Sequence, residues 1–440
     1  MKRMFSFELA CSARRALAWV GFGLVAAGLG GCVGWRGAVA PPGFGPGRTF
    51  TRVSSFVGNR LVTTRDGEAC LWDVPSGQQL RRFPGHPSAA QGWSLAGAAL
   101  SPDGSKLFTL AGSGGVLEIV FFEHWMVRVW DVATGEELRR FSKENTSSGQ
   151  VLAQFSPDAK QLLMVVGEQL VLLDIASGRQ VFAVPARCLQ DFRGDCTVSF
   201  SPDGRRIVEV AGGVALLRSV TNGEPALSIP CPDGVFVSGR FSPDGKHLLT
   251  VSSTGTARTW DVQSGRLVQV FVAPRGIVND AFFVGGGRRV LTAPQERDDS
   301  RGIAGLAGSG DMTARLWDSA TGREIRQFKL PAGTYFPRMI LSGDGKRLIL
   351  EGGLFDKRVG RRENYANYAT LWDVETGREI TRLNLSGGNA YMLGFSQTDE
   401  RFMLVTYAGK DMGKPAALWD GASGKRIREF IEPSPQAGGN

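Results

Sequence analysis

The sequence predicts an all-β protein in which about eight four-stranded antiparallel sheets close into a ring. Three observations support this. A tryptophan–aspartate segment recurs along the chain, a second turn segment alternates with it, and 59 glycines and 21 prolines among 440 residues favour short strands joined by tight turns. Consecutive copies of the first segment come as close as about 43 residues, which is the length of one four-stranded unit.

The tryptophan–aspartate segment combines a half-buried strand with the turn that ends it. The aspartate can bond loop amides, and a glycine four residues later can adopt a positive φ. Seven of the eight copies keep the aspartate and six also keep the tryptophan: Trp72, Asp73, Trp130, Asp131, Asp174, Trp260, Asp261, Trp317, Asp318, Trp372, Asp373, Trp419 and Asp420. Leu173 and Leu217 replace the tryptophan in copies three and four. In copy four we align Arg218 with the aspartate and Asn222 with the glycine, since asparagine tolerates that backbone conformation.

The second segment reads Ser-Pro-Asp-Gly or a close variant, at residues 101–104, 156–159, 201–204, 242–245 and 342–345. Proline, aspartate and glycine each suit a tight reversal, so a strand ends and another begins there. Each unit therefore contains four strands, named a to d in chain order. The d strands, such as 79–83, mix apolar with basic residues, which discourages association between sheet edges.

One such sheet cannot bury its own faces, so the units are expected to stack and close radially as a β-propeller. We predict eight blades, with seven as the alternative. The chain resembles the WD-repeat β-propeller family over residues 49–431, and in particular its looser bacterial members. Only Gly85-His86 matches the family's Gly-His dipeptide, so the family's histidine–hydroxyl–tryptophan bonds are expected to be mostly absent. Because residues 41–47 are rich in proline and glycine, side chains alone should join blades one and eight.

The N-terminus predicts export. Basic residues precede an apolar run that ends in Leu29-Gly30-Gly31-Cys32, which resembles the lipobox of bacterial lipoproteins. We expect residues 1–31 to be a lipoprotein-type signal peptide, Cys32 to carry lipid, residues 32–48 to form a tether and residues 432–440 a disordered tail. A secretory signal or an uncleaved helical anchor is the alternative. All three place the rest of the chain outside the cytoplasm, either secreted or on the inner or outer membrane facing the periplasm.

Charge and residue content narrow the partners. The formal net charge of +9 favours anionic headgroups, acidic glycans or acidic proteins, and an exported protein meets little nucleic acid. Cys188 and Cys196 flank a short loop and form the candidate disulfide. The three histidines are scattered, and catalytic, metal or nucleotide motifs are missing, so we expect no catalytic residue, metal or cofactor.

The candidate binding surface consists of segments that depart from the repeat. Connections between strands b and c are expanded at residues 111–125, 293–311, 352–367 and 408–415, and long connections on a rigid scaffold often carry binding. We expect them to form one crescent. It contains an aromatic cluster and a basic run with two tyrosines: Phe121, Phe122, His124, Trp125, Lys357, Arg358, Arg361, Arg362, Tyr365 and Tyr368. A hairpin tucked against the ring and a solvated loop are the respective alternatives.

These features predict a monomeric, non-catalytic scaffold for protein–protein interaction, tethered by lipid to a membrane of the cell envelope. Its protein partners would bind the b–c connections on one face. The alternative is a propeller enzyme or ligand-binding protein that uses the axial channel.

Overall fold

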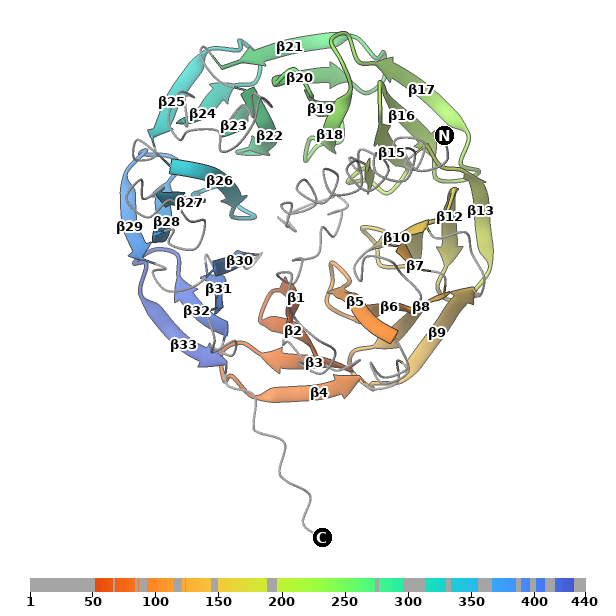
Figure 1. The fold of residues 1–440 in the computed structure, drawn as a ribbon. Coiled ribbons are helices and arrows are strands. Elements are labelled where there is room, and N and C mark those ends of the chain that lie inside the picture. Colours follow the sequence, from red (N-terminus) through yellow and green to blue (C-terminus); the bar gives the residue numbers. More distant parts are fainter. Residues whose placement is uncertain are drawn as a thin grey trace, which may run out of the picture.

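The structure is a computed structural model that describes residues 52–65, 68–83, 86, 93–113, 121–122, 124–143, 149–187, 196–273, 277–295, 313–329, 334–354, 366–384, 389–395, 401–407 and 416–430. Within these ranges the chain forms 33 strands, arranged as eight antiparallel sheets around a common axis (Figure 1). The prediction of an eight-bladed β-propeller is confirmed.

Each blade uses four strands in chain order, and β7 (Phe121–Phe122), which lies between two strands of blade two in the sequence, joins the sheet of blade three. Blades one to four contain β1 (Arg52–Val57), β2 (Arg60–Arg65), β3 (Glu68–Asp73) and β4 (Gln79–Phe83); β5 (Trp93–Leu100), β6 (Lys106–Ser113), β8 (His124–Asp131) and β9 (Glu137–Lys143); β10 (Gly149–Phe155), β11 (Gln161–Val166), β12 (Gln169–Asp174) and β13 (Gln180–Pro185); and β14 (Cys196–Phe200), β15 (Arg206–Ala211), β16 (Val214–Ser219) and β17 (Pro225–Pro230).

Blades five to eight follow the same order. They contain β18 (Phe236–Phe241), β19 (His247–Ser252), β20 (Thr256–Asp261) and β21 (Leu267–Val272); β22 (Ile277–Val284), β23 (Arg289–Gln295), β24 (Thr313–Asp318) and β25 (Glu324–Lys329); β26 (Thr334–Leu341), β27 (Arg347–Leu354), β28 (Ala366–Asp373) and β29 (Glu379–Asn384); and β30 (Asn389–Phe395), β31 (Arg401–Tyr407), β32 (Ala416–Asp420) and β33 (Arg426–Phe430).

The ring closes where β1 of blade one contacts β30 of blade eight. Neither blade borrows a strand from the other, because the two sheets have the orders β1-β2-β3-β4 and β30-β31-β32-β33. The a strands lie nearest the axis and the d strands form the rim (Figure 1). The predicted seam, held by side chains rather than by strand pairing, is confirmed for the described residues.

Apolar packing is concentrated between blades. One buried cluster joins Leu71 and Phe83 of blade one to Leu107 and Trp130 of blade two. The fifth residue of a d strand repeatedly places its ring against the tryptophan of the next blade, with centroid separations of 5.8 Å for Phe83–Trp130, 6.1 Å for Phe271–Trp317 and 5.8 Å for Phe328–Trp372. Each such ring contact contributes roughly 0.5–1.5 kcal/mol of stability beyond the contribution of the apolar area that the pair buries. Each of these blades therefore buries apolar surface against its neighbour.

The tryptophans also make regular hydrogen bonds. The indole nitrogen donates to a threonine hydroxyl at 2.8–2.9 Å in five blades: Trp72 to Thr63, Trp130 to Thr109, Trp260 to Thr250, Trp317 to Thr292 and Trp372 to Thr370. The expectation that this network is mostly absent is wrong for its hydroxyl–tryptophan half. The small number of histidines does not predict the absence of this bond, because the threonine that accepts from the buried indole belongs to the same blade and needs no histidine.

Blade four corrects one alignment made from the sequence. The Gly223 amide bonds the Ser219 carbonyl, as the Gly135 amide bonds the Asp131 carbonyl in blade two, and Gly223 has a φ of 73°. Ser219 therefore occupies the aspartate position, Arg218 the tryptophan position and Gly223 the glycine position. Asn222 lies one residue before the left-handed position. The alignment slipped because blade four has neither signature residue to fix its register.

Candidate binding surface

Antiparallel alternation gives the ring two distinct faces. The b–c and d–a connections leave one end of every blade, here the upper face, and the a–b and c–d turns leave the other end, the lower face. Strands b and c are joined by residues 66–67 in blade one and 212–213 in blade four, but by 114–123, 296–312, 355–365 and 408–415 in blades two, six, seven and eight. The four expansions predicted from the sequence are thus b–c connections.

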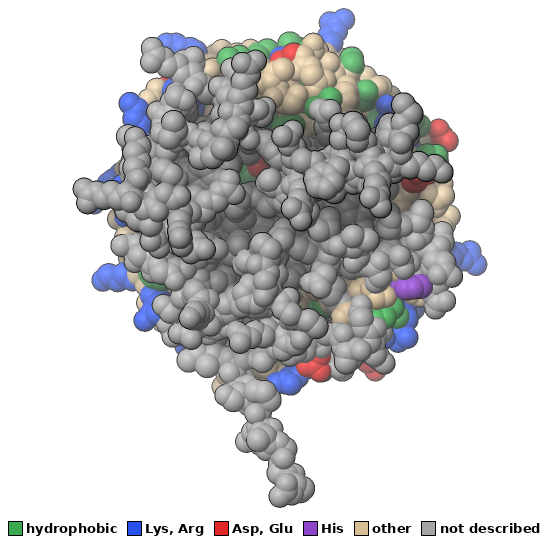
Figure 2. All heavy atoms as spheres, in the orientation of Figure 1, with side chains coloured by type: hydrophobic (Ala, Val, Ile, Leu, Met, Phe, Trp, Pro, Cys, Tyr) green, Lys and Arg blue, Asp and Glu red, His purple; other side chains and the backbone are tan. Residues whose placement is uncertain are grey.

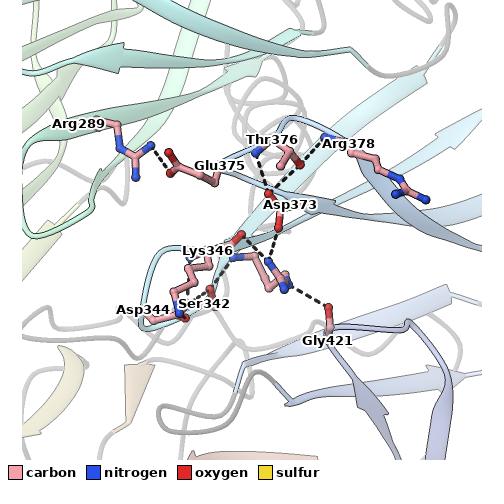
Figure 3. A network of polar contacts seen from close by, with 10 residues as sticks. Arg289, Ser342, Asp344, Lys346, Asp373, Glu375, Thr376, Arg378 and Gly421 are labelled. Atoms are coloured by element: carbon pink, nitrogen blue, oxygen red, sulfur yellow. Dashed lines mark hydrogen bonds and ion pairs between the residues drawn. The ribbon is translucent and has the colours of Figure 1, made fainter.

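The lower face is built for mutual bonding of its turns. In blade seven, Asp373 accepts bonds from the Thr376 amide at 2.7 Å and hydroxyl at 2.8 Å, and from Arg347 Nη1 at 2.5 Å (Figure 3). Arg347 Nε also donates to the Gly421 carbonyl of blade eight at 3.2 Å. Burial raises the pKa of Asp373, but the Thr376 bonds and the charge of Arg347 outweigh it and hold this pKa below its usual value. This carboxylate organises a turn and a blade junction.

The same turn chemistry recurs around the face. The pKa of Asp131 is lowered because the Thr134 amide and hydroxyl bond its carboxylate, and the pKa of Asp261 is lowered by the Ser264 hydroxyl and amide. Carboxylates already engaged in this way are poor general bases. The repeat aspartates of these turns therefore serve the fold, as the sequence pattern indicates.

A further set of lower-face contacts locks neighbouring blades together. The third residue of every d strand has a side-chain atom within 3.2 Å of the position that a Cβ would take on the turn glycine of the next blade. The eight pairs are Arg81–Gly135, Arg139–Gly178, Phe182–Gly223, Leu227–Gly265, Gln269–Gly322, Arg326–Gly377, Thr381–Gly424 and Arg428–Gly77. The last pair crosses the seam. Arg81 shows the polar form of the contact, donating 2.7 Å bonds to the Ala133 and Thr134 carbonyls.

The aromatic cluster predicted in blade two belongs to the upper face, and most of it is described. In blade two, β6 and β8 form a long hairpin in which Gly112 pairs with Trp125 and Ser113 with His124. Between them, the short strand β7 (Phe121–Phe122) pairs antiparallel with Gly149 and Gln150 of β10. β7 thereby becomes a fifth strand of blade three, and the hairpin is anchored on two blades.

The individual cluster residues differ in exposure. Trp125 is 6% exposed and packs with Phe108, Val127 and Val151, so its side chain belongs to the junction of blades two and three. His124 is half-buried at the start of β8. The backbones of Phe121 and Phe122 are described, and their side chains lie outside the described part.

The basic run predicted in blade seven falls almost wholly outside the described residues. Lys357, Arg358, Arg361, Arg362 and Tyr365 lie there, as do Cys32 and Cys188. Tyr368 is described, is 5% exposed, and lies under the guanidinium of Arg382 at 5.7 Å from the ring centroid. Its side chain packs within blade seven. Cys196 begins β14.

A buried polar network lies behind the blade-two hairpin. His86 Nε2 and the Thr109 hydroxyl are 2.7 Å apart, and that hydroxyl also accepts the 2.9 Å bond from Trp130. His86 Nδ1 has no bonding partner among the described residues. Burial, with the nearby charge of Arg128, lowers the pKa of His86 to about 4. The imidazole is neutral near pH 7 and joins the d–a connection before β5 to the hairpin.

Blade four replaces the tryptophan–threonine bond with a buried ion pair, which sequence reasoning missed. Arg218 Nε lies 3.1 Å from Glu209 Oε2, and the two side chains are 7% and 0% exposed. Arg218 also donates to the Gly223 carbonyl at 3.0 Å and the Pro185 carbonyl at 3.1 Å. Glu209 occupies the strand position that threonine holds in blades one, two, five and six. The sequence does contain a signal for this ion pair, because two oppositely charged residues stand at the positions that tryptophan and threonine hold in other blades.

The described residues contain no group of three histidine, cysteine, aspartate or glutamate side chains placed to hold a metal ion. They also contain no helix that is long and apolar enough to cross a membrane. Figure 2 shows one face of the molecule, with lysine and arginine side chains projecting from the rim.

Comparison with known proteins agrees with this architecture. The model of the WD domain, G-beta repeat, matches residues 224–261, which span β17 to β20. The C-terminal WD40 domain of Sif2 is similar, with 16% identity, a TM-score of 0.59, and 82% of this chain and 94% of that chain covered. A structure described as the eukaryotic initiation factor has 13% identity, a TM-score of 0.56, and coverages of 90% and 94%. No curated protein matches the sequence significantly.

At these identities the likeness establishes the fold. The chain contains a WD40 repeat and folds as a WD40-type β-propeller with eight blades.

Proposed function

We propose that this chain is a non-catalytic protein-interaction scaffold that binds its partner on the upper face and is tethered by lipid on Cys32 to the extracytoplasmic side of a bacterial membrane. WD40 propellers are commonly such scaffolds, and fold alone does not name the partner.

The observation that carries the proposal is the contrast between the two faces. On the lower face, the described turn aspartates and arginines bond one another, as in the Asp373–Arg347–Gly421 group. On the upper face, four b–c connections exceed what a hairpin needs, and one is clamped to two blades through β7 and β10. The polar groups of the lower-face turns are already bonded to one another, whereas the long b–c connections begin and end at the upper face. This difference favours recognition on the upper face.

The test compares cross-linked partners in membranes of the source cells. Residues 296–312, 355–365 and 408–415 are each replaced by a two-residue turn of the kind blade four uses at 212–213. We expect the partner adducts of the native chain to be lost. A lower-face substitution at an exposed turn residue, Gln263→Arg, serves as control and should keep them. Unchanged adducts in the shortened variants would refute upper-face binding.

Tethering has its own test. Cys32→Ala removes the thiol that lipid would modify, so the variant should lose incorporated lipid label and leave the membrane fraction. A variant that stays in the membrane fraction would show that another segment holds the chain there.

A further inference from the structure

The rim of the propeller changes in composition around blades three to five. The d strands β13, β17 and β21 read QVFAVP, PALSIP and LVQVFV and contain no charged residue. Each of the other five d strands contains at least one arginine. Charged side chains on an edge strand normally prevent pairing with a second molecule. Three consecutive blades lack this protection.

Equivalent positions in other d strands show which polar residues β21 has lost. The first and fourth residues of a d strand form polar pairs elsewhere: Glu137–Arg140 at 2.7 Å, Glu379–Arg382 at 2.9 Å and Glu324–Gln327 at 2.6 Å. In β21 these positions hold Leu267 and Val270. An ion pair on the rim has been replaced by two apolar side chains.

The apolar side chains of β21 form an exposed stripe. Val268, Val270 and Val272 are 42%, 37% and 57% exposed, and their alternation places them on one side of the strand. Gln269 and Phe271 point the other way, against Gly322 and Trp317 of blade six. One edge of β21 pairs with β20, and among the described residues no backbone bond reaches its other edge. Figure 2 shows hydrophobic side chains on the part of the rim where Figure 1 places β21.

In place of the monomer expected from the sequence, we propose that two copies of this chain associate through β21, edge to edge and antiparallel about a two-fold axis. An isologous contact requires a surface that complements itself, and a strand with alternating valines and no charge does so. The two backbone edges would bond each other, and the two valine stripes would lie side by side on the same face of the joined sheet, in contact across the strand pair. This surface is separate from the upper face, so the dimer is independent of the proposed partner site.

Charge explains why a second copy meets this part of the rim and no other. Four of the remaining d strands, β4, β9, β25 and β33, have a net positive charge, so two copies repel each other there. The fifth, β29, has no net charge but contains the Glu379–Arg382 ion pair, whereas β13, β17 and β21 contain no charged residue. The dimer should therefore strengthen as salt screens the residual repulsion, whereas an interface held by ion pairs would weaken. Because one strand pair is smaller than a standard interface, association should depend on concentration in the micromolar to millimolar range.

The experiment is sedimentation velocity of the purified full-length chain over about three decades of concentration up to roughly 1 mM. Val270→Lys places a charge in the centre of the stripe of both copies, so we expect dimer affinity to fall at least about tenfold. Gln327→Lys changes the equivalent residue of β25 in blade six and should leave affinity unchanged. Raising the ionic strength from about 0.01 M to about 0.15 M should increase the dimer fraction.

Hydrogen exchange of the native chain gives an independent readout if a variant folds poorly. The amides of residues 267–272 should become protected as concentration rises, and those of β25 should not. A native chain that remains monomeric up to the highest concentration overturns the proposal. So does a dimer that Val270→Lys weakens no more than Gln327→Lys, or one whose concentration-dependent protection falls outside β21.

Discussion

Substitution of Gly223 by alanine tests the blade junctions most sharply. Gly223 has a φ of 73°, and a Cβ there would lie 2.7 Å from Cδ2 and 3.0 Å from Cγ of Phe182 in blade three. Phe182 is 7% exposed and packed in a core cluster, so its ring cannot swing away. Alanine in the left-handed region costs roughly 1–2 kcal/mol. Overpacking adds about 1–3 kcal/mol, for a total of about 3 kcal/mol.

Gly58→Ala is the matched control. Gly58 has a φ of 57°, but nothing lies within 4 Å of its Cβ position, so only the conformational cost applies. With about 2.1 cal/mol/K of unfolding entropy per residue and about 380 residues between Arg52 and Phe430, each kcal/mol shifts Tm by about 1.3 °C. Calorimetry should show a fall of about 4 °C for Gly223→Ala and about 2 °C for the control. Pairing Gly223→Ala with Phe182→Ala should recover at least about 1 kcal/mol of the expected additive loss. Equal costs for the two glycines, with no recovery, would refute the idea that junction packing selects glycine.

Three further predictions follow from the polar network residues. The pKa of His86, lowered by burial to about 4, lies below its value of 6.5 in the unfolded chain, so the unfolded state binds the extra proton between those pH values. The free energy of unfolding contains the full contribution of neutral His86 above pH 6.5 and should fall by about 3 kcal/mol as the pH drops to 4. In denaturant melts at a series of pH values, His86→Gln should reduce this dependence on pH. An unchanged slope would contradict the assignment. Glu209→Ala leaves Arg218 buried without its carboxylate partner and should lower the free energy of unfolding, measured in urea, by about 3–5 kcal/mol. The double variant Glu209→Thr, Arg218→Trp recreates the threonine–tryptophan pair of the other blades and should recover most of that loss. Thr250→Val removes the acceptor of the 2.8 Å bond from Trp260 and should cost about 1–3 kcal/mol together with a shift in tryptophan fluorescence; no change in either would show that water satisfies the indole.

The sequence was sufficient for the blade count and the strand order because both depend on local chemistry. A tryptophan that ends a buried strand and an aspartate that opens the next turn, as at Trp130 and Asp131, fix each copy within a few residues. The prediction failed where that local chemistry was absent. In blade four, Ser219 takes the place of the aspartate at the start of the turn. Arg218 takes the tryptophan position, because Glu209 on the neighbouring strand pairs with its guanidinium.

Contacts between blades were beyond sequence reasoning for a different reason. The sequence presents Arg81 as an edge charge that discourages association, but in the structure Arg81 bonds the Ala133 and Thr134 carbonyls of the next blade, more than fifty residues away. The addition of β7 to blade three likewise depends on where the ring brings β10. Departure from the repeat marks the four long connections in the sequence, but it does not indicate that the side chains of Trp125 and Tyr368 are buried.

Hydrogen exchange of the chain with and without its cross-linked partner tests the central claim most directly. If the upper face binds, the partner should slow exchange in the b–c connections of blades two, six, seven and eight and in the β7–β10 pair, and leave the turns that follow Asp131, Asp261 and Asp373 unchanged. Protection confined to those turns would contradict the claim and would place the partner on the opposite face of the ring.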